Sequence, residues 1–162
     1  GRGVMRSSPV AHLLFSLNDV PILGSTFWRL RLHPIFRKIM EGGVVHKESL
    51  PPALLREMNA VGNRPHHYRA LMSLAHHWAG WEDARAHYGK IAVPVLLVYG
   101  EGDWSRPDER EANRRAIPGA QMTIVKDAGH FLSLDAPEAV IQHILRFTHA
   151  REEGMREPSA LD

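Results

Sequence analysis

An acidic residue and a histidine in the second half of the chain each come just after an apolar run and a glycine. Asp103 lies past Gly100 and Gly102, and His130 directly follows Gly129. A carboxylate can bind one nitrogen of an imidazole, fix its tautomer and stabilise the imidazolium, while the other nitrogen takes up a proton. Histidine suits this work because an imidazole exchanges protons near neutral pH. The two residues together predict the acid and the base of a catalytic relay.

Both residues follow predicted strands. The run 93–99 is apolar and rich in β-branched residues, as is typical of a strand covered on both faces, and a second short strand is expected at 120–125. With helices after each strand, this alternation predicts a parallel sheet, whose strands end at the same edge. We therefore expect a carboxylate oxygen of Asp103 within hydrogen-bond reach of a ring nitrogen of His130.

The segments around the strands are predicted to be helical. One helix begins near Ser105–Glu109, with proline and acidic residues in its first turn, and ends at Arg114-Arg115, as the helix dipole favours. Asp135 is expected to cap a later helix. Residues 8–88 are broken by prolines and glycines into short helices, and in one of them the apolar side chains recur at helical spacing: Leu54, Leu55 and Met58.

Asp127 and Asp135 also flank the histidine and could serve as its acid. Asp135 is better explained as a helix cap and Asp127 as a solvated residue, so Asp103 is the favoured partner. The aromatic neighbours of the acid and the base, Trp104 and Phe131, are candidates for lining a substrate pocket. Trp104 could equally pack against the helix that follows it.

The turn that carries the acid could instead bind a nucleotide. A dinucleotide-binding turn requires Gly-x-Gly-x-x-Gly, so that the backbone can approach the pyrophosphate. Gly100 and Gly102 fit this pattern, but Ser105 stands at the third glycine position, and Asp103 and Asp108 would repel phosphate. We therefore expect no nucleotide and no organic cofactor.

Two histidine pairs, His66-His67 and His76-His77, suggest a metal site. If one helix carried both pairs, residues 66 and 77 would lie roughly 16 Å apart, at about 1.5 Å per residue, which is too far to share an ion. No metal site is expected, and the pairs are assigned to the surface or to packing.

Composition narrows the class of protein. The 162 residues are 44% hydrophobic and 23% charged with a net charge of +2, which is ordinary for a globular domain, and no long Lys/Arg run indicates nucleic-acid binding. Cysteine is absent, which excludes disulfides and a thiol nucleophile. The apolar segment 10–23 is too short and too polar for a membrane span. The cytoplasm is the expected compartment.

Two stretches, PVLLVYGEGDWSRP (94–107) and IVKDAGHFLSLDAPEAVIQHILRF (124–147), resemble the last third of the α/β-hydrolase fold family. In that family a strand ends in Gly-x-x-Asp with a proline four residues later, and a later strand leads into a Gly-His loop and a Pro-Glu helix start. The matching residues here are Gly100, Asp103, Pro107, Gly129-His130 and Pro137-Glu138. The resemblance covers about residues 90–149. It implies that Asp103 orients the catalytic base and that His130 is that base.

The resemblance also implies an α/β fold class, the C-terminal portion of an α/β-hydrolase parallel sheet preceded by a helical cap. Residues 1–89 would form the cap, 90–150 a strand-helix-strand-helix part of the core, and 151–162 a flexible, charged tail. The family's nucleophile elbow, Gly-x-Ser-x-Gly, does not occur in the sequence. We therefore expect the chain to be incomplete, with the nucleophile and the first strands elsewhere.

The implied function is a hydrolase for a small or medium-sized apolar molecule. A serine nucleophile would give hydrolysis of an ester or a related bond, whereas an aspartate would give dehalogenase or epoxide-hydrolase chemistry. The alternative is a catalytically inactive remnant that acts as a binding or structural module. Because one strand would lack a neighbour, self-association through the exposed sheet edge is also expected.

Overall fold

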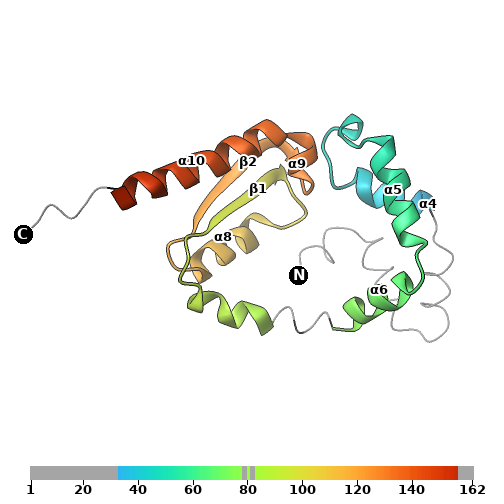
Figure 1. Cartoon of the computed structure of the whole chain (residues 1–162), viewed down its shortest axis with the longest axis horizontal. Coiled ribbons are helices and arrows are strands. Elements are labelled where there is room, and N and C mark those ends of the chain that lie inside the picture. The colour runs from blue at the N-terminus through green and yellow to red at the C-terminus, as the bar shows by residue number, and fades with distance from the viewer. Residues whose placement is uncertain (1–32, 78–79, 81–82, 157–162) are drawn as a thin grey trace, which may run out of the picture.

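The computed structural model describes residues 33–77, 80 and 83–156 (Figure 1), and predicted features in 1–32 lie outside this part. The elements in chain order are α4 (His33–Glu41), η1 (Lys47–Ser49), α5 (Pro52–Gly62), α6 (His67–His76), η2 (Arg85–Lys90), β1 (Leu96–Gly102), α8 (Pro107–Ala116), β2 (Gln121–Gly129), α9 (Leu132–Asp135) and α10 (Pro137–Arg156).

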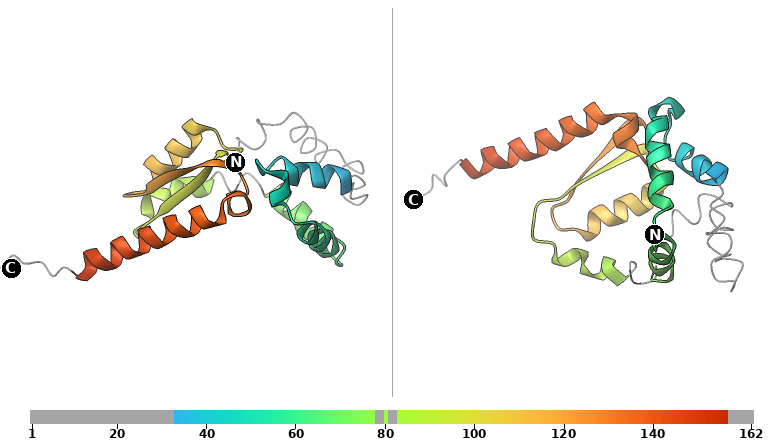
Figure 2. Two further views of the ribbon diagram at one scale, coloured as in Figure 1. Left: turned by 90° about the horizontal axis from the view of Figure 1, so that it is seen from above. Right: turned by 45° about the vertical axis from the view of Figure 1, so that its right-hand side comes forward.

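The two strands β1 and β2 pair in parallel, and in the described part of the chain they make up the sheet. Their register runs from Leu96 opposite Gln121 to Gly100 opposite Val125. Helices α8 and α10 lie on opposite faces of this pair (Figure 2). The predicted α/β class with a parallel sheet is confirmed.

Both strands begin and end later than the sequence predicted. Val93 and Pro94 precede the ladder, because proline has no N–H to donate to a neighbouring strand. The ladder starts where the Gln121 N–H donates to the carbonyl oxygen of Val95 at 2.9 Å. At the other end β1 continues through Gly102 and β2 through Gly129. The strands therefore reach almost to Asp103 and His130 themselves.

An irregularity interrupts the pairing just before His130. Gly100 pairs with Val125 and Gly102 pairs with Gly129, so β2 has extra residues at this point. Asp127, one of these residues, has a φ of 54°, in the left-handed region. A side chain at Gly100 would collide with the carbonyl oxygen of Gly129. The close approach of the two strand ends thus requires a glycine in β1.

Helix α8 begins and ends as its sequence predicted. Pro107 occupies the first turn, and the Arg106 N–H donates to Glu109 Oε2 at 3.1 Å. Acidic residues lie in the first turn, and Arg114 and Arg115 lie in the last. Helix α10 continues through Arg156, so helix extends into the segment 151–162 where a flexible tail was expected.

Helices α4 and α5 and the residues between them, here called the helical region (33–62), lie beside the end at which the strands terminate (Figure 1). One apolar cluster connects them to the loop after β2. Its buried members are Met40, Val44 and Leu50, and the partly buried side chains packed on it are Leu55, Met58, Phe131 and Leu134. The predicted helix at Leu54–Met58 is confirmed as part of α5. That this helical region serves as a cap stays a prediction.

The backbone between α4 and η1 lies directly against the loop that carries His130. The Phe131 N–H donates to the carbonyl oxygen of Gly43 at 2.7 Å. A Cβ atom on Gly43 would collide with the Phe131 ring and lie 3.0 Å from Trp104 Cζ2, and one on Gly129 would lie 2.6 Å from the Gly43 oxygen. Two glycines therefore allow the helical region to touch the histidine loop.

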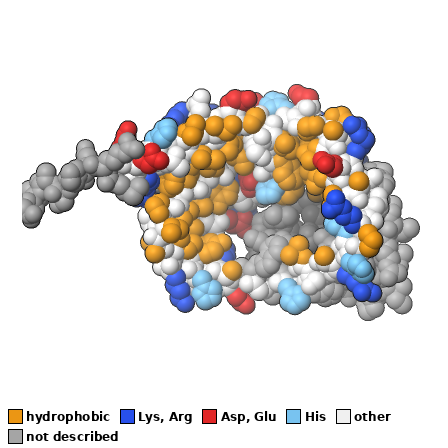
Figure 3. All heavy atoms as spheres, viewed as in Figure 1, with side chains coloured by type: hydrophobic (Ala, Val, Ile, Leu, Met, Phe, Trp, Pro, Cys, Tyr) orange, Lys and Arg blue, Asp and Glu red, His pale blue; other side chains and the backbone are white. Residues whose placement is uncertain are grey.

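One face of the molecule is markedly apolar. Figure 3 shows hydrophobic side chains gathered on the face that presents α10 and the strands. On α10, Ile141, Ile144 and Leu145 are each about half exposed, at 55%, 48% and 48%. No helix among the described residues is long and apolar enough to cross a membrane.

Replacing Gly43 tests the contact between the helical region and the histidine loop. We expect Gly43→Ala to lower the free energy of unfolding by about 1–3 kcal/mol, because the added methyl group must displace Phe131 and Trp104. The measurement is urea denaturation followed by circular dichroism. The matched control is Gly42→Ala, whose Cβ would lie 3.4 Å and 3.5 Å from two carbonyl oxygens, an ordinary contact. Equal stability of the two variants would contradict the close approach.

Candidate active site

The structure brings Asp103 and His130 together at the ends of the paired strands. Asp103 follows the last residue of β1, and His130 follows the last residue of β2. His130 Nδ1 lies 2.9 Å from Asp103 Oδ2. This distance confirms the predicted hydrogen-bond contact between the two side chains. Their catalytic roles stay a prediction.

Asp103 is an almost buried carboxylate with a full set of hydrogen bonds. Its side chain is 7% exposed. Oδ1 accepts bonds from the Ser105 N–H at 2.6 Å and from the Ser105 hydroxyl, and Oδ2 faces His130. Burial acts to raise the pKa of Asp103, but the hydrogen bonds from His130 and Ser105 outweigh it and lower the pKa to about 2. The carboxylate is therefore ionised at neutral pH.

An ionised Asp103 determines the tautomer of His130. A carboxylate without its proton can only accept hydrogen bonds, so Nδ1 of His130 must carry the hydrogen that they share. In neutral His130 the other nitrogen, Nε2, then has a free lone pair. Among the described residues Nε2 has no hydrogen-bond partner, and the His130 side chain is 37% exposed. The ring is oriented to accept a proton at Nε2.

A buried arginine, which the sequence analysis did not single out, holds the acid-bearing turn. Arg110 of α8 is 5% exposed. Its Nη1 donates to the Gly100 oxygen at 3.0 Å, and Nη2 donates to the oxygens of Asp103 at 3.0 Å and Ser105 at 2.6 Å. The sequence of α8, PDEREANRRA, contains no large apolar side chain that could have marked a buried face of the helix. Arg110 fixes the backbone on which Asp103 stands.

Both aromatic candidates contact the base. The Trp104 ring stacks on the His130 ring with 4.1 Å between centroids and 15° between planes. Phe131 meets the His130 ring edge-on, with centroids 5.3 Å apart. The Trp104 Nε1–H also donates to the Gly42 oxygen at 2.9 Å. Whether Trp104 and Phe131 also line a substrate pocket stays a prediction.

The prediction that Asp135 caps α10 is wrong. The helix begins at Pro137, and Asp135 is the last residue of α9. Its carboxylate instead accepts backbone N–H groups from Val45 at 2.9 Å, His46 at 3.2 Å and Gly129 at 2.8 Å. Burial acts to raise the pKa of Asp135, and these hydrogen bonds lower it. Asp135 thus joins the helical region to the residue before the base.

Asp127 is exposed, as expected, but it also has a partner. Its Oδ2 lies 2.8 Å from Nε2 of His46, and this hydrogen bond raises the pKa of His46. The contact of His130 with a carboxylate is made by Asp103 and not by Asp127. Of the three acidic residues weighed as the partner of the base, Asp103 is the one in place.

The two histidine pairs, His66-His67 and His76-His77, lie at opposite ends of α6. The described residues contain no group of three His, Asp or Glu side chains that could hold a metal ion.

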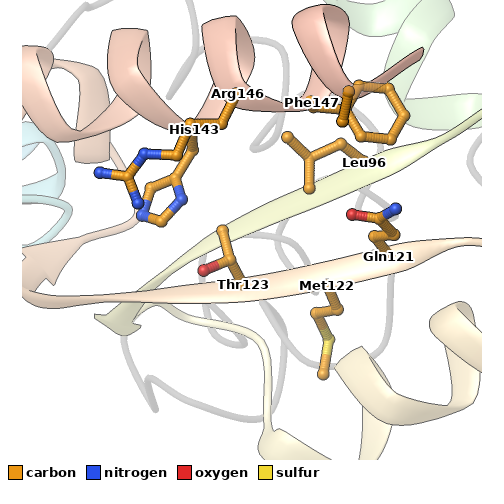
Figure 4. Close-up of a pocket in the computed structure, with 8 residues that line it drawn as sticks. Leu96, Gln121, Met122, Thr123, His143, Arg146 and Phe147 are labelled. Carbon is orange, nitrogen blue, oxygen red and sulfur yellow. The ribbon is translucent and has the colours of Figure 1, made fainter. Parts of the chain in front are cut away.

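A groove of about 300 Å³ lies between α10 and the strands (Figure 4), where Leu96 and Thr123 face His143 and Phe147. It lies near the beginnings of the strands, whereas Asp103 and His130 follow their ends. The groove is therefore separate from the candidate active site.

Comparison with known proteins identifies the family. The model of the alpha/beta hydrolase family matches residues 5–143, so the chain belongs to this family. The predicted resemblance is confirmed. The stacked, hydrogen-bonded histidine lies at the carboxyl edge of the sheet, where open α/β sheets place their sites.

Three relatives illustrate the match. The chain is 46% identical to the carboxylesterase YbfK of Bacillus subtilis (strain 168) over 59 residues, which are 35% of this chain and 20% of that protein. Cfl2 from Burkholderia cenocepacia has a TM-score of 0.69 at 19% identity over 82% of this chain and 46% of its own. A thermophilic esterase from Thermogutta terrifontis has a TM-score of 0.54 at 26% identity over 88% of this chain and 51% of its own. The chain spans about half the length of these two solved structures.

The lowered pKa of Asp103 makes the stability of the fold sensitive to acid. A carboxylate whose pKa falls on folding contributes stability above its unfolded pKa of 3.8, and this contribution is lost as the pH falls towards 2. The shift corresponds to about 2 kcal/mol. In urea denaturation between pH 6 and pH 2, the free energy of unfolding of the wild type should therefore fall more steeply than that of Asp103→Asn. The control, Asp108→Asn at an exposed position, should lose stability as steeply as the wild type. If Asp103→Asn also followed the wild-type pH profile, this contribution of Asp103 to stability would be contradicted.

Removing the Arg110 guanidinium should destabilise the acid-bearing turn. Arg110→Met removes this donor from the carbonyl oxygens of Asp103 and Ser105, and each buried unpaired acceptor costs about 1–3 kcal/mol. The Gly100 oxygen also loses Arg110 but keeps the Asp103 N–H at 3.1 Å. We expect a loss of about 3 kcal/mol or more in the free energy of unfolding. Arg115→Met, at a side chain that is 68% exposed, should change stability by less than about 0.5 kcal/mol. Similar effects of the two substitutions would show that Arg110 does not hold the turn.

Proposed function

We propose that this chain supplies the acid and the base of an α/β hydrolase that cleaves an ester or a closely related bond. The observation that carries the proposal is the 2.9 Å contact between His130 Nδ1 and an ionised Asp103 at the end of two parallel strands. His130 is the general base and acid, and Asp103 is its orienting carboxylate.

The proposed proton path follows from the tautomer. Nε2 of His130 removes the proton of the nucleophile as it attacks the carbonyl carbon, and the ring becomes an imidazolium. Asp103 stabilises this charge through the Nδ1–H bond and does not take up the proton, since its pKa is about 2. The imidazolium then donates the proton from Nε2 to the leaving alcohol. A water molecule that attacks the acyl group repeats the cycle.

The described serines near the site are poor candidates for the nucleophile. Ser105 donates its hydroxyl hydrogen to the carboxylate of Asp103 and is therefore committed to the acid. Ser133 lies in the exposed part of α9. We place the nucleophile outside the described residues. A serine there gives ester hydrolysis, which the carboxylesterase and esterase names of two relatives favour, whereas an aspartate gives dehalogenase or epoxide-hydrolase chemistry.

The proposed substrate is a small apolar molecule. The two side chains beside His130 are aromatic, and both are partly exposed. Rings in this position offer apolar surface to an acyl or alcohol group at the point where the proton is transferred. The helical region packed against the loop after β2 supplies further apolar residues nearby.

Substitution of the acid and the base tests the proposal in the full-length protein. With a nitrophenyl ester as substrate, His130→Ala should abolish turnover, and Asp103→Asn should lower kcat by about four orders of magnitude because the histidine takes the wrong tautomer. The control is Asp127→Asn, which removes an exposed carboxylate that contacts His46 rather than His130 and should keep near-normal rates. A wild-type protein without esterase activity would contradict the proposed ester hydrolysis, and near-normal rates in His130→Ala would show that the base is misassigned.

A further inference from the structure

We propose that Trp104 is a positioning residue for His130, holding one face of the imidazole and stabilising its protonated form. The inference rests on the proposed function, in which His130 is the base. It gives Trp104 a role beyond that of a pocket-lining side chain.

The stack is close and nearly parallel. The ring centroids of Trp104 and His130 lie 4.1 Å apart, and the planes differ by 15°. A T-shaped contact would place a ring edge against the indole, whereas here the imidazole lies over its face. The face of an indole carries negative electrostatic potential and attracts a cation placed above it. The imidazolium formed during proton transfer is such a cation.

The remaining contacts of the ring leave it little freedom. Asp103 holds Nδ1 at 2.9 Å, and Phe131 meets the ring at 62° with centroids 5.3 Å apart. Phe131 also lies edge-on to Trp104, with centroids 5.5 Å apart. The imidazole is thus held at one nitrogen, on one face and at an edge. Among the described residues, the charged group that contacts the His130 ring is the carboxylate of Asp103.

The indole is itself fixed at two places. Arg110 binds the carbonyl oxygens of Asp103 and Ser105, the residues on either side of Trp104, so the backbone of the turn cannot shift freely. The Nε1–H of the indole donates to the Gly42 oxygen at 2.9 Å. The second bond ties the face of the base to the helical region. A displacement of the segment around Gly42 would therefore move the indole and, with it, the surface on which the His130 ring stacks.

Two substitutions separate the stack from the hydrogen bond. Trp104→Leu removes both, whereas Trp104→Phe keeps an aromatic face and loses the Nε1 donor. In NMR spectra of the full-length protein, the His130 ring protons should lose their upfield ring-current shift in Trp104→Leu and keep most of it in Trp104→Phe.

Kinetics provide the second measurement. In Trp104→Leu we expect kcat to fall about three- to tenfold with little change in KM, because the ring acts on the charged state of the base, and we expect Trp104→Phe to restore most of the rate. Phe147→Leu, which removes an aromatic ring at the groove under α10, is the control and should leave both readouts unchanged. Circular dichroism melting checks that each variant is folded.

The outcomes distinguish this inference from the proposed function. If His130→Ala keeps normal turnover, the proposed function fails, while the ring-current shifts of His130 in Trp104→Leu and Trp104→Phe still report on the stack. If His130→Ala is inactive but Trp104→Leu turns over like the wild type, the role of Trp104 is overturned. Equal loss in Trp104→Phe and Trp104→Leu would also overturn it, since the bond to Gly42 rather than the stack would then be responsible.

Discussion

The parallel pairing of β1 with β2 places every group of the candidate site. Because the strands run in the same direction, Asp103 and His130 emerge at one edge, and the irregularity before Gly129 brings the histidine loop close to the end of β1. The approach is possible only where the backbone lacks a side chain, as at Gly100. An antiparallel pair would have put the two residues at opposite ends of the sheet.

Around this edge, the polar groups are arranged to keep two loops rigid. Arg110 binds the carbonyl oxygens of the acid-bearing turn. Asp135 binds the N–H groups of Gly129 and of Val45, which lies between α4 and η1. One group is a cation facing acceptors and the other an anion facing donors, so each satisfies backbone groups that the strands leave unpaired. The acid and the base are therefore held from two independent directions.

The sequence predicted the strands, their parallel order and the contact of Asp103 with His130, because apolar runs, glycines and chain order are local signals. It did not reveal the task of Arg110, since an arginine on a helix is usually solvated and its burial depends on where β1 lies. Asp135 resembled a helix cap for the same reason: its true partners, such as Val45, are distant in the sequence. The stack of Trp104 on His130 likewise arises only from tertiary packing.

The pairing of Asp103 with His130 is tested most directly by the protonation of the two ring nitrogens. Nitrogen-15 NMR of the full-length protein, at a pH where the ring is neutral, separates a nitrogen that carries hydrogen from one that does not. The contact of Nδ1 with an ionised carboxylate predicts that Nδ1 is protonated and Nε2 is free in the wild type, and that this preference weakens in Asp103→Asn. A neutral ring protonated at Nε2 in the wild type would contradict the proposed acid–base pair.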